Sequence, residues 1–228
     1  MTAAALAALI VLLQAPSAGR LEGTARISSR LTALRLRVRL YAEPGDPGQP
    51  VPAPNGTNPF ANVVLYLEDA EPLTASDPAP PPLPPVMRQH QERFEPHVLA
   101  VVQGTTISFP NDDPIYHNVF SLSRARTFDL GRYPQGQSKS LRFGSAGVVQ
   151  VFCHIHADMN GYILVLPNRY FISPDSSGHF VIDGVPPGEY RLVAWHERIR
   201  PIVTPVRVDA GQTTLLELSI PLAETQRP

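Results

Sequence analysis

Short apolar runs recur along most of the chain, and clusters of polar and turn-forming residues separate them. Residues 34–40 (LRLRVRL) alternate between apolar and basic side chains, and residues 62–68 (NVVLYLE) form a compact apolar run. Both patterns are typical of β-strands, the first with one face buried and the other in solvent. A further short strand is predicted at 21–27. The arginines of 34–40 could bind an anionic partner, but a solvated outer face is the more common role of such a row.

Ten more short strands are predicted from residue 98 onward, each rich in β-branched and apolar residues. They comprise 98–102, 105–109, 119–122, 138–143, 148–153, 162–166, 180–182, 190–196, 203–208 and 213–220. Turn-forming groups such as Pro110-Asn111-Asp112 and Pro186-Pro187-Gly188 stand between them. Short strands at this spacing predict an all-β sandwich or barrel. No segment after the N-terminal apolar run has the pattern of an amphipathic helix.

Proline is unusually frequent, at 26 of 228 residues, which is about twice its average usage. Because proline breaks helices and favours turns and linkers, this composition excludes a helical bundle. Residues 44–59 hold six prolines and are predicted to form a loop, and a second proline cluster lies at 78–85. Such a cluster favours extended polyproline II geometry. We therefore predict a semi-rigid linker at 71–89 that marks a domain boundary.

The charge balance excludes one large class of function. Lys+Arg 19 and Asp+Glu 20 give a formal net charge of −1, whereas a nucleic-acid-binding domain carries a strongly basic face. No nucleic-acid partner is therefore expected. Hydrophobic residues make up 43% of the chain, a share that is close to the usual one and argues against general disorder.

The N-terminus has the pattern of an export signal. Residues 3–13 form an apolar run without a charge, and the small residues Ala15, Ser17 and Ala18 follow. The run is too short to span a bilayer core about 30 Å thick but fits the apolar region of a secretory signal peptide. No Lys or Arg precedes it, which leaves a misplaced start codon or an uncleaved membrane-proximal tail as alternatives. We predict a signal peptide at 1–18, a periplasmic or otherwise extracytoplasmic location, and no membrane span after cleavage.

The candidate chemistry is concentrated around the only cysteine, Cys153, which cannot form an intramolecular disulfide. An exposed free thiol is a liability in an oxidising compartment, and metal binding would protect it. Cys153, His156 and Met159 follow the strand predicted at 148–153 with the spacing C-x-x-H-x-x-M, and His117 lies at a turn that enters another strand. Two histidines and one cysteine with a weak axial methionine describe a blue-copper electron-transfer site.

Each of these residues also has a purely structural interpretation. A lone cysteine at a strand end is usually a small buried apolar residue, a lone histidine is usually a satisfied core or surface group, and a methionine often fills a gap in the core. Their joint spacing favours a metal site, at which zinc is the main competitor of copper. Structural zinc sites prefer several cysteines, and a thioether is a poor zinc ligand.

The other histidines are not expected to bind the metal. His154 adjoins the cysteine, and strand alternation should direct its side chain away from the copper. The remaining four have no partner visible in the sequence and are predicted to be structural or exposed. They are His90, His97, His179 and His196.

Three motifs together resemble the cupredoxins, and in particular the amicyanin type. They are Gly104-Thr105-Thr106-Ile107-Ser108-Phe109-Pro110-Asn111, His117-Asn118-Val119 and Cys153-x-x-His156-x-x-Met159. The resemblance covers residues 90–168 and implies a Greek-key β-sandwich with one mononuclear copper. It also implies that His117 and His156 are the imidazole ligands, Cys153 the thiolate and Met159 the axial ligand. Asn118 matches a position whose polar side chain ties the two ligand loops together in that family.

A second resemblance covers the last third of the chain. Residues 176–190 (SSGHFVIDGVPPGEY) look like the carboxypeptidase-regulatory, transthyretin-like β-sandwich. That domain usually begins with two strands like those predicted before residue 70. We therefore predict a discontinuous transthyretin-like sandwich made of 20–70 and 169–222, with the cupredoxin domain inserted. A tandem order, with 20–70 as extra cupredoxin strands, is the alternative. The arrangement resembles bacterial periplasmic proteins often labelled methylamine-utilisation-like.

The sequence thus predicts an extracytoplasmic type 1 copper protein that exchanges single electrons with a redox partner protein and transforms no substrate itself. One four-ligand site leaves no position for a substrate, and no Ser-His-Asp order or nucleotide-binding glycine loop is visible. By the resemblance, the electron leaves through the edge of His156, with Ile115 and Ala157 on the apolar rim. Two alternatives stay open. One is copper sequestration, delivery or sensing, and the other is binding of a surface glycan or protein by the transthyretin-like part.

Overall fold

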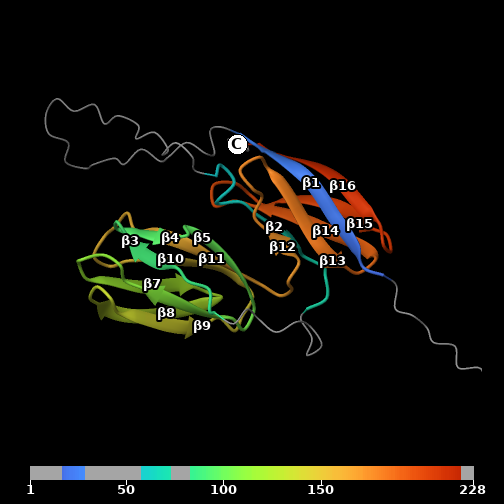
Figure 1. Cartoon of the computed structure of the whole chain (residues 1–228). Helices are drawn as coiled ribbons and strands as arrows, with labels where there is room; N and C mark the ends of the chain where they lie inside the picture. The colour runs from blue at the N-terminus through green and yellow to red at the C-terminus, as the bar shows by residue number, and fades with distance from the viewer. Residues whose placement is uncertain (1–16, 29–57, 73–82, 222–228) are drawn as a thin grey trace, which may run out of the picture.

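The computed structural model describes residues 17–28, 58–72 and 83–221 (Figure 1), and all of their regular structure is β. The predicted all-β class is therefore confirmed. None of the described residues forms a helix with the length and apolar character that crossing a membrane requires. The apolar run 3–13, the strand predicted at 34–40 and most of the two proline clusters lie outside the described residues.

Sixteen strands are described, and most are short. They are β1 Gly19–Ile27, β2 Val64–Leu67, β3 Arg88–His90, β4 Arg93–Glu95, β5 Val98–Val102, β6 Thr106–Pro110, β7 His117–Ser123, β8 Arg126–Tyr133, β9 Ser138–Arg142, β10 Gly147–Phe152, β11 Asn160–Leu166, β12 Phe171–Ile172, β13 His179–Val185, β14 Gly188–Trp195, β15 Ile202–Val208 and β16 Thr213–Ile220.

The strands from β3 to β11 form a central sandwich. One layer is the five-stranded sheet β5-β11-β10-β7-β8, and the other consists of the two-stranded sheets β3-β4 and β6-β9. Alternate residues of both layers point into one core, for example Phe109 of β6 opposite Val151 of β10 and Ile163 of β11. This period-2 pattern buries one face of each strand. The end of β10 lies beside the middle of β7, where Phe152 pairs with Phe120.

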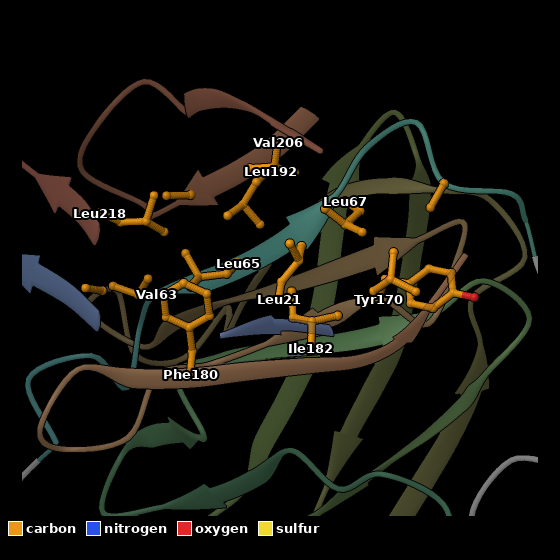
Figure 2. Close-up of a cluster of buried hydrophobic side chains, with 14 of the residues drawn as sticks. Leu21, Val63, Leu65, Leu67, Tyr170, Phe180, Ile182, Leu192, Val206 and Leu218 are labelled. Carbon is orange, nitrogen blue, oxygen red and sulfur yellow. The ribbon is translucent and has the colours of Figure 1, made fainter. Parts of the chain in front are cut away.

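The remaining strands form a flanking sandwich with a core of its own (Figure 2). Its sheets are β13-β1-β16 and β12-β2-β14-β15. β1 pairs antiparallel with β13 and parallel with β16 along its whole length, and β2 pairs antiparallel with both β12 and β14. The chain segments before and after the central strands therefore share both sheets. In Figure 1 the blue and teal strands accordingly lie among the orange and red ones.

Four strands are missing from the sequence-based prediction. β3 and β4 are three-residue, largely polar strands, β12 has two residues, and β8 is an exposed edge strand that contains Gly131. None of them carries enough apolar alternation to be recognised. The C-terminal end of the predicted linker 71–89 is paired with other described strands. Val86 bridges to Ser108 and β3 pairs with β4, so residues 86–89 belong to the central strands.

The two sandwiches contact each other through a small apolar cluster. Val98, Leu164 and Leu166 from β5 and β11 pack with Val64 and Trp195 of the flanking sandwich. These three central residues lie on the face of the five-stranded sheet that points away from its own core, because their chain neighbours Leu99, Ile163 and Val165 pack in that core. The contact has a polar edge where His97 Nε2 lies 2.7 Å from Glu197 Oε2.

Gly178 provides a test of the flanking sandwich. Its φ is +86°, and an added Cβ would lie 2.1 Å from the carbonyl oxygen of Ala25 on β1. Gly184 has a similar φ of +70°, but the nearest atom to its Cβ would be 3.8 Å away. We expect Gly184→Ala to cost about 1–2 kcal/mol of stability through backbone strain, and Gly178→Ala to cost roughly 1–3 kcal/mol more through overpacking.

The measurement is urea unfolding followed by the fluorescence of Trp195, the only tryptophan in the chain, which lies in this sandwich. Equal losses for the two variants would contradict the close approach of the turn at Gly178 to β1.

Candidate metal centre

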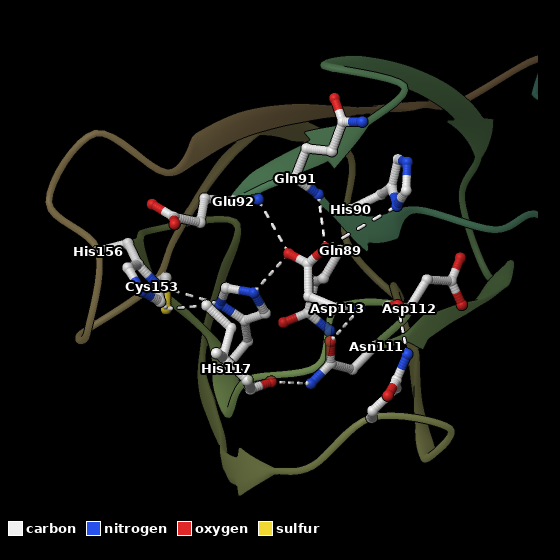
Figure 3. A network of polar contacts seen from close by, with 12 residues as sticks. Gln89, His90, Gln91, Glu92, Asn111, Asp112, Asp113, His117, Cys153 and His156 are labelled. Atoms are coloured by element: carbon white, nitrogen blue, oxygen red, sulfur yellow. Dashed lines mark hydrogen bonds and ion pairs between the residues drawn. The ribbon is translucent and has the colours of Figure 1, made fainter.

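Three side chains that could bind a metal meet at one end of the central sandwich (Figure 3). His117 is the first residue of β7, Cys153 directly follows β10, and His156 lies in the loop from β10 to β11. One potential ligand atom from each residue lies within 4.8 Å of the other two. His117 and Cys153 are buried, whereas His156 is half-buried. The pairing of β7 with β10 is what brings residues 36 positions apart in the sequence together.

The donor atoms have the separations expected around a single ion. Cys153 Sγ lies 3.8 Å from Nδ1 of His117 and 3.8 Å from Nδ1 of His156, and the two nitrogens are 3.1 Å apart. Bonds of about 2.0 Å to nitrogen and about 2.3 Å to sulfur at trigonal angles place N and S about 3.7 Å apart. The two imidazoles and the thiol are thus already arranged to hold a metal ion.

The ligand loop is closed by its own backbone. Cys153 N donates a hydrogen bond to Met159 O at 3.1 Å, and Met159 N donates to His156 O at 3.0 Å. The side chain of Met159 is buried in the same apolar cluster as Cys153. The three residues of the C-x-x-H-x-x-M motif therefore form one compact turn, and the Met159 side chain is buried in the core of the central sandwich.

A buried carboxylate that the sequence-based reasoning missed orients the first histidine. Asp113 Oδ2 lies 2.8 Å from Nε2 of His117, and the Asp113 side chain is almost completely buried. The same carboxylate accepts hydrogen bonds from the backbone N–H groups of Gln91 and Glu92, at 2.6 and 2.9 Å. Because Nε2 donates to Asp113, the Nδ1 lone pair of His117 faces Cys153 and is available to a metal.

The electrostatics of Asp113 agree with this role. Burial by itself would raise the pKa of the carboxyl, but the hydrogen bonds from Glu92, His117 and Gln91 outweigh it and hold the pKa of Asp113 below its usual value. Gln91 and Glu92 adopt φ values of 51° and 57° in the turn between β3 and β4, which aims both N–H groups at the carboxylate. An aspartate four residues before a predicted histidine ligand was the signal available in the sequence.

Asn118 joins the two segments that carry the ligands. Its Oδ1 accepts a hydrogen bond from His154 N at 2.7 Å, and its Nδ2 donates to Asp129 Oδ1 at 3.2 Å. The residue next to His117 is thereby tied to the residue next to Cys153. The His154 side chain itself stacks on Phe120 with ring centroids 3.7 Å apart, and it is not one of the three clustered ligands.

None of the other histidines belongs to the cluster of three, and each has a defined environment. His90 approaches Asp113 at 3.8 Å, His97 pairs with Glu197, His179 pairs with Glu22, and His196 is buried. Burial lowers the pKa of His196, which favours its neutral form. Ile115 and Ala157, which are expected on the rim around His156, are both exposed.

Comparison with known proteins gives limited similarities. Residues 168–216 match the family model described as polysaccharide lyase family 4, domain II. This description differs from the transthyretin-like one, which stays a prediction. No curated protein matches the sequence.

Among solved structures, an oxidised amicyanin variant has a TM-score of 0.34 and 22% identity and covers 44% of this chain and 97% of its own. The reduced Cu(I) form of another amicyanin variant at pH 4 has a TM-score of 0.35 and 23% identity with the same coverage. A copper-containing nitrite reductase from Thermus scotoductus SA-01 has a TM-score of 0.36 and 25% identity, and it covers 42% of this chain and 25% of its own. TM-scores this low carry no argument about the metal. The choice of metal therefore depends on the donor atoms described above.

Replacement of Asp113 should weaken metal binding without removing a ligand. We expect Asp113→Asn to lower the affinity for Cu(II) about 10–100-fold, because the amide orients the imidazole of His117 less firmly. Asp112→Asn is the matched control, since the neighbouring Asp112 forms only an exposed ion pair with Arg88. A competitive titration against a chelator of known affinity measures the difference. Equal affinities of the two variants would contradict the role of Asp113.

Proposed function

We propose that the chain is a copper protein of the cupredoxin type that carries single electrons. The observation that supports this most directly is the convergence of two imidazole Nδ1 atoms and one cysteine Sγ in a buried site. Met159 completes a soft, mixed donor set from the same loop. Two histidines, one thiolate and a weak thioether suit copper better than zinc, whose structural sites prefer several thiolates.

The residues of the chain would act as follows. His117, His156 and Cys153 would hold the ion, and Met159 would supply a further, weaker thioether ligand. Bound copper supplies a one-electron couple between Cu(I) and Cu(II). Asp113 and Asn118 fix the orientation of the ligand segments, so that little rearrangement accompanies a change of oxidation state. Because these four side chains would occupy the coordination positions, no position would be left for a substrate, and this favours a carrier over an enzyme.

The proposed context is an exported protein with two β-domains. Residues 86–168 would form the copper domain, inserted between two segments of the flanking sandwich, 20–70 and 169–222. The pairing of β1 with β13 and β16 supports this division. The N-terminal apolar run 3–13 supports export as a signal peptide. Outside the cytoplasm, metal binding would protect the unpaired Cys153 from oxidation.

The first test is the colour of the copper-loaded protein. We expect one equivalent of Cu(II) to give an intense thiolate-to-copper absorption band and a narrow parallel hyperfine splitting in the electron paramagnetic resonance spectrum. Cys153→Ser should lose this band and keep the far-ultraviolet circular dichroism of a β protein, because the thiolate is the source of the colour. A colourless parent protein would reject the electron-carrier proposal, and a coloured Cys153→Ser would reject the ligand assignment.

The reduction potential tests the axial ligand. Met159→Gln should lower the potential, because a carbonyl oxygen stabilises Cu(II) more than a thioether does, and Met159→Leu should raise it. Met87→Leu makes the same change at another methionine buried in the same core, and we expect it to leave the potential unchanged. Cyclic voltammetry measures all three. A shift in Met87→Leu as large as in Met159→Leu would show that packing, and not axial ligation, sets the potential.

A role in copper delivery would give a different result. A thiolate–thioether set also holds Cu(I) well, so affinity alone does not separate the two functions. Fast electron self-exchange and a stable oxidised form support the carrier. Copper that stays reduced and passes to an acceptor protein would support delivery.

A further inference from the structure

The carboxylate of Asp113 links the proposed metal site to a histidine at the surface. Its Oδ2 atom lies 2.8 Å from Nε2 of His117, and its Oδ1 atom lies 3.8 Å from Nδ1 of His90, the last residue of β3. Figure 3 shows both contacts as dashed lines. The His90 side chain is 46% exposed, whereas those of Asp113 and His117 are almost completely buried. A proton bound at the surface therefore changes the charge next to a candidate ligand inside the sandwich.

Asp113 is a fixed negative charge between the two imidazoles. Burial would raise the pKa of its carboxyl, but the hydrogen bonds from Glu92, His117 and Gln91 outweigh burial and keep the pKa below its usual value. The carboxylate therefore stays ionised near neutral pH. Its charge attracts the Nε2–H of His117, which makes the imidazole a stronger donor at Nδ1. A positive charge on His90 would offset part of this attraction.

The other charged groups around His90 keep their charge near neutral pH. The described β3–β4 hairpin carries four further charged side chains, all exposed, which are Arg88, Glu92, Arg93 and Glu95. Arg93 lies opposite His90 in the register, and Arg88 pairs with Asp112 at 3.0 Å. The strands that contact the hairpin, β6 and β11, contain no charged residue. Carboxylates and guanidinium groups stay charged between about pH 5 and 8, whereas an imidazole changes its charge in that range.

We propose that His90 couples the redox state of the metal site to the binding of a proton, and that it acts through Asp113. This inference rests on the proposed electron-carrier function and adds a regulator of the same site. A positive His90 weakens the attraction between Asp113 and His117, so the ligand donates less and the reduced state is favoured. By linkage, reduction strengthens proton binding at His90 by the same factor. The electron comes from the redox partner, which is oxidised, and the His90 imidazole takes its proton from solvent.

The size of the coupling follows from separation and exposure. Two charges about 10 Å apart, one of them half exposed to water, change each other's equilibrium constant by roughly two- to fourfold. At about 59 mV per tenfold for a one-electron couple, this factor corresponds to about 18–36 mV between the two charge states of His90. The reduction potential should therefore fall as the pH rises through the titration of His90. High salt should reduce the difference, because His90 is partly in solvent.

Two substitutions fix the charge at position 90, since lysine stays positive and glutamine stays neutral. The reduction potential of the copper-loaded full chain is measured by cyclic voltammetry between about pH 5 and 9. We expect His90→Lys to match the parent protein at the acidic end and His90→Gln to match it at the alkaline end, with the same copper spectrum in all three. Any titration of His154 or His156 is common to the three proteins and cancels in the comparison. Equal potentials of the two variants at every pH would overturn the proposal.

His179 provides the matched control. It is a histidine of the flanking sandwich whose side chain is 45% exposed and whose Nε2 lies 3.1 Å from Glu22 Oε1. His179→Lys and His179→Gln therefore make the same charge changes at a histidine–carboxylate pair outside the central sandwich. We expect both variants to keep the potential of the parent protein at every pH. Shifts as large as those at position 90 would show an effect of net charge alone and would also overturn the proposal.

The metal-free chain tests the contact between His90 and Asp113 without copper. In nuclear magnetic resonance spectra, we expect the carboxyl carbon of Asp113 and the amide proton of Gln91 to shift as His90 titrates. Both shifts should be absent in His90→Gln. Resonances of Asp113 and Gln91 that do not follow His90 would reject the coupling and leave the electron carrier intact. A parent protein without the copper colour would instead reject the electron carrier, and the coupling with it, even where these resonances follow His90.

Discussion

The carboxylate of Asp113 joins the turn between β3 and β4 to His117 of the candidate metal centre. It accepts two backbone N–H groups from the turn between β3 and β4 and one hydrogen bond from Nε2 of His117. A buried carboxylate that lacked these donors would be costly, since burial disfavours its charge. The short polar hairpin therefore stabilises the charge that orients the histidine. Through this contact, the stability of an outer hairpin and the geometry of the metal ligands depend on each other.

The sequence showed the candidate ligands but not the residues that support them. The C-x-x-H-x-x-M spacing could be recognised because its three residues lie in one tight loop, so that residues close in sequence are also close in space. The hydrogen bond from Cys153 N to Met159 O shows this closeness. Most strands could be predicted for a similar reason, because their alternation is visible within five to eight residues. β3 and β4 could not, since polar three-residue strands become strands only through pairing with each other and contact with the rest of the sandwich.

Contacts between distant segments explain the other omissions. Asp113 resembles an ordinary turn residue in the run Pro110–Pro114, and only the fold shows that its side chain turns inward to His117. The contact between the two sandwiches was equally hidden. Alternation predicts which residues point outward, but not that, among the described residues, the flanking sandwich packs on β5 and β11. Such coverage depends on the packing of one sandwich against another, for which a single sequence has no local signal.

Cys153 follows the end of β10, where its own side chain faces the core and the side chains of its two chain neighbours face outward. In an extended strand, consecutive side chains point to opposite faces, so a cysteine directed into the core is flanked by residues directed outward. Phe152 and His154 occupy these positions and meet at Phe120 on the outer face. His156, three residues later in a turn, lies at the end of the sandwich instead. A metal held by Cys153 and His156 would thus be connected to two surfaces by short covalent paths.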